Sequence, residues 1–370
     1  MRGPCAYRRR GAARPSRMRR GVRSCTRSES TVRSQSPFAR RKAAVRPYYI
    51  ENAMFGLVLL SGLGQVPEQI HLALTEAPGA MRVTWATMTP GDGDGHVVYW
   101  AEGTNRSAAG SAYTYDGDGF VGTLHTAVLE GLTTGTRYTY SVISAAGFVS
   151  RPLTFRYQRE AAQISLLAYG DMGVKNSWGT VKLADADAAS GVYDLFLNVG
   201  DTSYADDNGQ HGHNGVIFDE HFRNIEGHAA TMPFMSVAGN HESQYSFAPY
   251  IARLPMPKMQ RATAAMAPFY FSFDYGPAHF VGYSSEHSLE AGSEQHNFLA
   301  ADLAAAALPA ARAARPWIVM FTHHPMYCSD GLLPLWESRC SAQFEIAASG
   351  GGGGSGGSGG GDGGGGGGAM

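Results

Sequence analysis

The chain has 370 residues, a formal net charge of −1, 44% hydrophobic residues and 11% aromatic residues. A chain of this length and composition can bury more than one hydrophobic core, and it predicts two domains. No stretch reaches the roughly 18 apolar residues that a membrane-spanning helix needs, which argues against a membrane span.

The first fifty residues differ sharply in charge from the rest of the chain. They hold fourteen Arg and one Lys against a single acid, Glu29. Such a stretch is typical of an arm that binds nucleic acid or an anionic surface, or of a plastid or mitochondrial transit peptide. We favour a basic disordered leader over residues 1–53, because Met54 opens a second plausible start and residues 54–65 resemble a signal-peptide remnant. No nucleic acid is then expected as a partner.

Two further patterns favour a secretory route. Cys328 and Cys340 lie twelve residues apart around a Gly-Leu-Leu-Pro turn, and they could close a disulfide loop in an oxidising compartment. Asn105 begins an Asn-Arg-Ser sequon for N-glycosylation. These patterns predict a glycoprotein that is secreted or held in a vacuole or lysosome, with plastid or mitochondrial targeting as the alternative.

The end of the chain is of low complexity. Residues 349–370 are almost entirely Gly and Ser, and Asp362 is the only charged residue among them. Such a tract buries no apolar surface, so residues 348–370 are expected to form a flexible coil. We interpret it as an artefact of gene prediction or cloning, and a linker is the alternative.

Short alternating strands separated by Gly, Pro and Asp dominate residues 66–158. The expected strands cover residues 69–75, 81–86, 96–100, 124–129, 136–142 and 153–157. This pattern predicts an all-β sandwich of roughly ninety residues.

The periodicity changes in residues 159–347, where apolar strands alternate with helical stretches at residues 181–189, 216–226 and 294–307. The alternation predicts βαβ units and a parallel sheet. Residues 269–275 and 279–283, joined by Gly276-Pro277, add an antiparallel hairpin. The second domain is therefore expected to be an α/β layer domain with a mixed sheet.

Four apolar runs in this region each end in residues that can bind metal ions. The runs cover residues 164–170, 193–200, 234–239 and 317–322, and they deliver Asp171, then Asp201 and Tyr204, then Asn240 and His241, and finally His323. Ligands of open α/β sheets gather beyond the carboxyl ends of the strands. We therefore expect these side chains to form one site, and their chemistry indicates metal-assisted hydrolysis.

The types of donor atom indicate which metal ions would suit the site. The carboxylate of Asp201 can bridge two cations, and the phenol of Tyr204 is a hard oxygen donor that prefers a trivalent cation such as Fe(III). Asn240 offers an amide oxygen, and His241 beside it need not be a ligand. The order of these motifs along the chain indicates a metal site more specifically than any single motif does.

The blocks Gly-Asp-x-Gly, Gly-Asp-x-x-Tyr-x-Asp, Gly-Asn-His-Glu and His-x-Pro-x-Tyr resemble the first four motif blocks of the purple acid phosphatases. The resemblance covers roughly residues 67 to 346 and is nearest to the animal and algal type. It implies a fibronectin-III-like domain followed by a metallophosphoesterase domain. By this resemblance the chain is an acid phosphatase that hydrolyses small phosphate monoesters.

The resemblance also implies roles for individual residues. Asp171 and Tyr204 would hold Fe(III), Asp201 would bridge, and Asn240 and His323 would hold a divalent Fe, Zn or Mn ion. A metal-bound hydroxide would be the nucleophile of this binuclear centre. His241 would hydrogen-bond the phosphate and protonate the leaving group.

One block of the family pattern is missing. The family's fifth block, Gly-His-x-His, is not found after Phe344-Glu-Ile346, and Gln210-His-Gly-His213 is interpreted as a solvated loop. The chain as written is therefore expected to be incomplete, and without the last two His ligands it is expected to be inactive. Two alternatives to the acid phosphatase stay open: a non-catalytic fragment or pseudoenzyme, and a metallophosphodiesterase or nucleotidase. The tyrosine ligand argues against the last of these.

Other residues near the motifs receive weaker assignments. His324 is a candidate phosphate contact, and Asp206 is a candidate for steadying Tyr204 or the following loop through hydrogen bonds. Four other histidines of the second domain are placed on helical or loop surfaces without a chemical role: His221, His228, His287 and His296. The sequence does not predict the oligomeric state.

Overall fold

The computed structural model describes residues 64–159, 162–175, 177–208, 215–257 and 269–325. The basic leader, residues 54–63, the Cys328 and Cys340 pair, the Gly-rich tail and the Gln210-His-Gly-His213 segment lie outside these ranges. Within them, no helix combines the length and the apolar composition needed to cross a bilayer.

The first part of the described chain is an antiparallel sheet of seven strands in the order β1-β2-β5-β4-β3-β6-β7. Its strands are β1 (Glu68–Leu74), β2 (Met81–Thr87), β3 (His96–Ala101), β4 (Thr104–Tyr113), β5 (Thr123–Leu129), β6 (Arg137–Ile143) and β7 (Leu153–Arg156). Large side chains from its different strands, such as Trp85, Tyr140 and Phe155, are fully buried between its two halves. The expected all-β region is therefore present.

Strand β4 is the one strand of this sheet that the sequence does not predict. Residues 104–109 pair with β3, and residues 110–113 pair with β5. The strand thus passes from one half of the sandwich to the other. Small and polar residues dominate it, so its intrinsic strand preference is low, and the pairing on both sides stabilises it instead.

The second part begins with a parallel sheet in the order β10-β9-β8. It contains β8 (Leu166–Tyr169), β9 (Leu195–Asn198) and β10 (Phe234–Ser236), connected by α2 (Trp178–Ser190) and α3 (Gly215–Ala229). Strand β9 is buried along its whole length, as expected for the central strand of a covered parallel sheet. The predicted βαβ units are therefore present.

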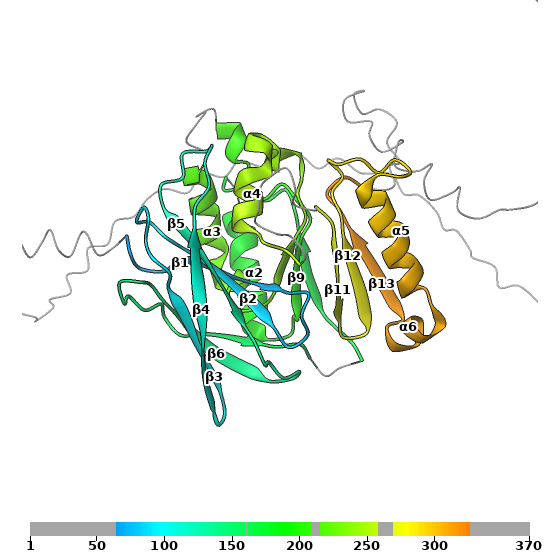
Figure 1. Ribbon diagram of the computed structural model, residues 1–370, viewed down its shortest axis with the longest axis horizontal. Coiled ribbons are helices and arrows are strands. Elements are labelled where there is room, and N and C mark those ends of the chain that lie inside the picture. Colours follow the sequence, from blue (N-terminus) through cyan, green and yellow to red (C-terminus); the bar gives the residue numbers. More distant parts are fainter. Residues whose placement is uncertain (1–63, 160–161, 176, 209–214, 258–268, 326–370) are drawn as a thin grey trace, which may run out of the picture. The chain divides into compact units, whose positions relative to one another are not determined.

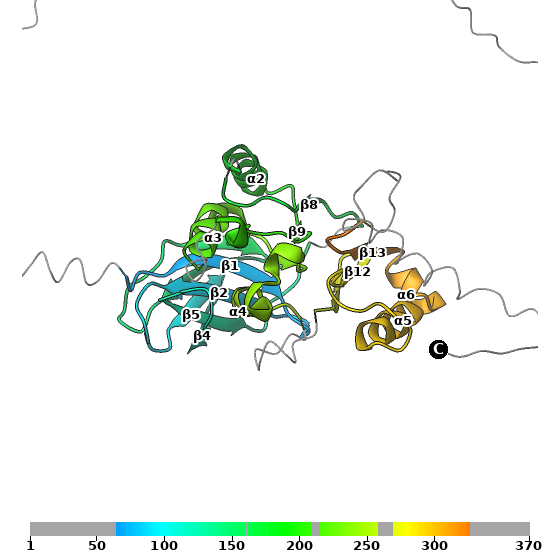
Figure 2. The ribbon, with the colours of Figure 1, turned by 90° about the horizontal axis from the view of Figure 1, so that it is seen from above.

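The remaining strands form a second sheet of three strands, β11 (Phe271–Tyr275), β12 (Ala278–Gly282) and β13 (Trp317–Phe321). Strands β11 and β12 form the expected antiparallel hairpin, and β13 runs parallel to β12. Helices α5 (Glu294–Ala306) and α6 (Pro309–Ala314) lie along this sheet (Figures 1 and 2). The strands expected in one mixed sheet are therefore divided between two sheets.

A buried arginine joins the β-sandwich to the α/β part. Arg253 ends the short helix α4 (Ala248–Arg253), and only 1% of it is exposed. Its guanidinium donates hydrogen bonds of 2.9 Å each to Tyr115 Oη, Gln69 Oε1 and Asp219 Oδ1. Tyr115 and Gln69 belong to the sandwich, whereas Asp219 lies on α3. The contact therefore ties three segments of the chain to one cation.

We expect the Asp219→Ala substitution to destabilise the protein strongly. Removing one partner of a buried ion pair leaves the other charge uncompensated, which typically costs about 3–5 kcal/mol. Urea unfolding of the variant, with Glu220→Ala as the control at the exposed neighbouring position, measures this cost. A loss of stability equal to that of the control would contradict the prediction.

Candidate metal centre

The side chains that follow β8 and β9 meet at the carboxyl ends of these strands. Tyr204 Oη donates a 2.9 Å hydrogen bond to Asp171 Oδ1. Asp171, Asp201 and His323 each offer one donor atom, and these three atoms lie within 4.8 Å of one another. His323 follows β13, so the second sheet contributes to the same cluster.

Asp201 is the buried centre of this cluster. Its Oδ2 lies 3.3 Å from His323 Nε2, and its Oδ1 accepts a 3.0 Å hydrogen bond from the backbone N–H of His241. His323 Nε2 also lies 3.1 Å from Asn240 Oδ1, while its Nδ1 lies 3.0 Å from the carbonyl oxygen of Val199. The structure therefore brings together all five residues that the sequence suggests as ligands.

The backbone at these positions adopts an uncommon conformation. Asp171, Asp201 and Tyr204 have positive φ angles of 53°, 49° and 52°. Non-glycine residues rarely adopt this region, and such strain concentrates at functional sites. Gly239 allows the tight approach, because a Cβ there would overlap the Asp201 carboxylate.

Glu242 holds together the loops around the cluster, and the sequence motifs did not predict this role. Its buried carboxylate accepts hydrogen bonds from the backbone N–H groups of Asp201 and Gly239 at 2.9 Å and of Thr202 at 2.8 Å. Burial raises the pKa of Glu242 to about 7, although these hydrogen bonds act in the opposite direction. The sequence signal that could have identified Glu242 is its place as the last residue of the Gly-Asn-His-Glu motif.

His241 lies beside the cluster, and its orientation is set by Asp206. The imidazole Nδ1 is 2.8 Å and 2.9 Å from the two carboxylate oxygens of Asp206, and its ring centroid is 4.2 Å from that of Tyr204. Asp206 therefore contacts His241, a partner that the sequence analysis did not name. Nδ1 donates its hydrogen to Asp206. The other ring nitrogen, Nε2, lies on the side of Asp201, 3.7 Å from its Oδ2.

The electrostatics of the cluster favour a cation. Burial and the hydrogen bond to Asp171 raise the pKa of Tyr204, since a phenolate beside two carboxylates is repelled. Burial lowers the pKa of His323, but the Asp201 carboxylate outweighs it and raises this pKa to about 9. Carboxylate, phenol, amide and imidazole donors around one point suit iron, zinc or manganese. The residues present therefore fit a metal centre.

Two histidines that the sequence places on the surface are buried. His228 is fully buried in α3, where Nδ1 lies 2.8 Å from Asp185 Oδ1 and Nε2 lies 2.8 Å from Tyr169 Oη. His221, on the same helix, is 1% exposed, and burial lowers its pKa to about 3. The surface interpretation was wrong for both, because the helical pattern alone does not show that α3 packs against both α2 and β1.

The remaining predicted residues lie apart from the cluster or beside it. The ring of His324 lies 4.9 Å from that of His323. Asn105 is exposed in β4, which is compatible with the glycosylation prediction without testing it.

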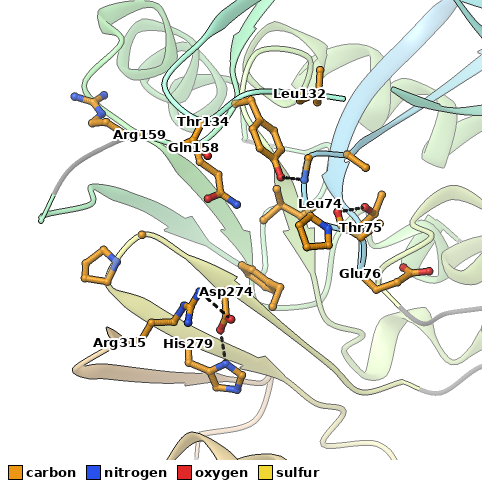
Figure 3. Close-up of a pocket in the computed structure, with 18 of the residues that line it drawn as sticks. Leu74, Thr75, Glu76, Leu132, Thr134, Gln158, Arg159, Asp274, His279 and Arg315 are labelled. Atoms are coloured by element: carbon orange, nitrogen blue, oxygen red, sulfur yellow. Dashed lines mark hydrogen bonds and ion pairs between the residues drawn. The ribbon is translucent and has the colours of Figure 1, made fainter. Parts of the chain in front are cut away.

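A cavity of about 890 Å³ lies at the other end of the second sheet. It is lined by the β11–β12 hairpin, the residues before β13 and the end of β1 (Figure 3). In its wall His279 Nδ1 is 2.7 Å from Asp274 Oδ1, while His279 Nε2 is 2.7 Å from Asp302 Oδ2 on α5. Arg315 also pairs with Asp274 at 3.2 Å. Because β12 and β13 end at the metal cluster, the cavity is not part of that site.

Comparison with known proteins identifies two matching family models. The model of the purple acid phosphatase N-terminal domain matches residues 67–157, and that of the calcineurin-like phosphoesterases matches residues 164–350. Acid phosphatase type 7 of Homo sapiens is 34% identical over an alignment of 292 residues, and the match covers 75% of this chain and 64% of the relative. A purple acid phosphatase of Glycine max is 27% identical over 80% of this chain and 64% of its own length.

A solved purple acid phosphatase from yellow lupin seeds shares the fold. The TM-score is 0.62 with 24% sequence identity, and the match covers 72% of this chain and 52% of the lupin chain. The chain thus spans less than two thirds of the length of these relatives.

We expect Glu242→Gln to loosen the loops that carry Asp201 and Gly239. Glutamine has one acceptor oxygen, and its NH₂ group would face backbone N–H groups, so buried donors would lose their partners at a cost of about 1–3 kcal/mol. Urea unfolding measures the change against the exposed control Glu130→Gln. Equal stability of the two variants would show that the carboxylate is not needed.

His279 predicts a pH-dependent contribution to stability. Burial lowers its pKa, but the hydrogen bonds to Asp302 and Asp274 outweigh this and raise the pKa above its ordinary value of 6.5. The stabilisation is therefore fully present below that value and is lost as the pH rises through the higher folded-state pKa. The stability difference between the wild type and His279→Gln should be largest at about pH 5 to 6.5 and shrink above it. A difference that is constant with pH contradicts this.

Proposed function

The chain belongs to the purple acid phosphatases, within the calcineurin-like phosphoesterase family, and from this premise we propose that it hydrolyses small phosphate monoesters at acidic pH. The observation that carries the proposal is the convergence of Asp171, Tyr204, Asp201 and His323 at the ends of three strands from two sheets. A cluster of this composition supports phosphoester hydrolysis assisted by metal ions.

The proposed cofactor is a binuclear centre of one Fe(III) and one divalent Fe, Zn or Mn ion. Asp171 and Tyr204 would hold the first ion, Asp201 would bridge, and Asn240 and His323 would hold the second. When bound, such a centre supplies Lewis acidity and an activated water molecule. The raised pKa of Tyr204 without a cation supports a trivalent partner, since a strong positive charge is needed to favour the phenolate.

His241 is the proposed general acid. Asp206 holds its Nδ1, and this contact fixes the orientation of the ring. Nε2 is then the atom that can donate a proton to the leaving-group oxygen of the ester. An imidazole titrates near the acidic working range, so it can carry that proton when substrate binds.

The exposed sequon at Asn105 supports the proposal of a secreted or vacuolar glycoprotein. The substrates are proposed to be small phosphate esters, because the donor cluster would bind the phosphoryl group itself.

The test is metal content and hydrolysis of p-nitrophenyl phosphate near pH 5 by the 370-residue chain, compared with Tyr204→Phe. We expect about two metal ions per chain and a visible absorption band that Tyr204→Phe loses, because the band requires a tyrosine oxygen on Fe(III). Tyr193→Phe, at the opposite end of β9, is the matched control and should keep the band.

Two other results would change the conclusion. A chain that binds no metal and hydrolyses no ester would favour the non-catalytic alternative. A chain that prefers phosphodiesters or nucleotides over p-nitrophenyl phosphate would favour the other phosphoesterase activities of the family.

A further inference from the structure

Asn198 is a fully buried amide at the carboxyl end of the central strand of the first parallel sheet. It is the last residue of β9, and it lies in register with Tyr169, the last residue of β8, and with Ser236, the last residue of β10. Its exposed fraction is 0%. A buried amide requires hydrogen-bond partners, and the proposed mechanism gives this one no role. Because Asn198 stands close before Asp201 in the chain, its contacts bear on the loop that carries this ligand.

The amide nitrogen of Asn198 donates hydrogen bonds to two buried hydroxyl groups. Nδ2 lies 2.9 Å from Thr202 Oγ1 and 2.9 Å from Ser236 Oγ. Thr202 and Ser236 are both buried, so water does not compete for these bonds. The first bond closes the turn at Gly200-Asp201, because it joins a residue before the turn to a residue after it. The second bond ties the same amide to β10.

Thr202 joins the loops that carry the predicted ligands. Its backbone N–H donates a 2.8 Å hydrogen bond to Glu242 Oε1, and its carbonyl oxygen accepts one of 3.0 Å from the backbone N–H of Gly173. Gly173 belongs to the loop of Asp171, whereas Glu242 belongs to the loop after β10. The backbone of Thr202 is thus bound to both neighbouring loops, and its side chain is bound to Asn198.

The other polar atom of the Asn198 side chain indicates that stability alone does not account for this residue. Oδ1 is buried and has no hydrogen-bond partner among the described residues. A buried acceptor without a partner destabilises the folded state. An apolar side chain of similar size would avoid this cost, so the two N–H bonds are the feature that favours asparagine at this position.

We propose that Asn198 is a positioning residue of the metal centre, whose hydrogen bond to Thr202 holds the neighbouring Asp201 carboxylate in place to bind metal ions. The inference rests on the proposed function, because it assigns the ions to the cluster around Asp201. Asn198 is not a ligand in this proposal, and it acts only through Thr202.

The test measures Zn(II) binding to the full chain by isothermal titration calorimetry, after a chelator has removed any bound metal. It compares Asn198→Leu, which removes the amide, with Thr202→Val, which removes the hydroxyl, and with the double variant. Each single substitution should raise the Kd for Zn(II) on the order of tenfold, the effect of one lost hydrogen bond. The double variant should match the single variants, because both substitutions remove the same bond.

Two further variants separate positioning from folding. Thr202→Ser keeps the hydroxyl and should keep the wild-type Kd, and its comparison with Thr202→Val decides the question even where Asn198→Leu does not fold. Tyr140→Phe removes a buried 2.7 Å hydrogen bond in the sandwich, from Tyr140 Oη to the carbonyl oxygen of Ala230. It should lower the urea midpoint of the chain without changing the Kd for Zn(II).

Four results overturn the role of Asn198. They are a wild-type Kd in Asn198→Leu or in Thr202→Val, a double variant about a hundredfold weaker than the wild type, a Thr202→Ser variant as impaired as Thr202→Val, and an equal rise of the Kd in Tyr140→Phe. In the last case a general loss of stability, and not the position of Asp201, would be the cause.

The two proposals fail in different ways. If the wild type binds no Zn(II), the metal centre and the role of Asn198 are overturned together. If Zn(II) binds with the expected dependence on Asn198 and Thr202 but p-nitrophenyl phosphate is not hydrolysed, only the proposed function is wrong. If the wild type is active and Asn198→Leu binds Zn(II) as tightly as the wild type, only the role of Asn198 is overturned.

Discussion

The buried carboxylate of Glu242 is the interaction on which the candidate site depends. It accepts hydrogen bonds from three backbone N–H groups in two loops, those of Asp201 and Thr202 after β9 and that of Gly239 after β10. One ionisable side chain therefore satisfies donors that would otherwise be buried without partners. The same contacts set the distance between the loops, and with it the position of the Asp201 carboxylate beside His323.

The close approach of the loops also requires two positions without a side chain. Gly200 has a φ of 88° and packs against the Cβ of His323, where a side chain would come within 2.8 Å. Gly239 faces the Asp201 carboxylate in the same way. The glycines of the Gly-Asp and Gly-Asn-His-Glu motifs thus allow two sheets to bring their strand ends together, while the polar residues after them supply the chemistry. The strain of the positive φ angles at Asp171, Asp201 and Tyr204 is held by this packing.

Around the site, buried polar contacts join segments that are distant in the sequence. Arg253 connects the sandwich to α3, and the Asp185–His228–Tyr169 chain connects α2, α3 and β8. Removing one member of such a network destabilises the protein, because the remaining polar groups stay buried without a hydrogen-bond or ion-pair partner. The β-sandwich is accordingly a structural part of the α/β region and not only an appendage before it.

The sequence by itself determined the β-sandwich, the βαβ units, the hairpin and the order of the motif blocks, because hydrophobic periodicity and strand-end motifs are local signals. It missed β4, whose small polar residues are stabilised by neighbouring strands, and it misjudged the burial of His221 and His228. The partners of Asp206 and Glu242 were decided only by the tertiary structure. Asp206 contacts His241, and Glu242 contacts Asp201 and Thr202, all at least 35 residues away along the chain, and no local pattern encodes such a distance. The division of the strands into two sheets was decided in the same way, by the packing of side chains between elements.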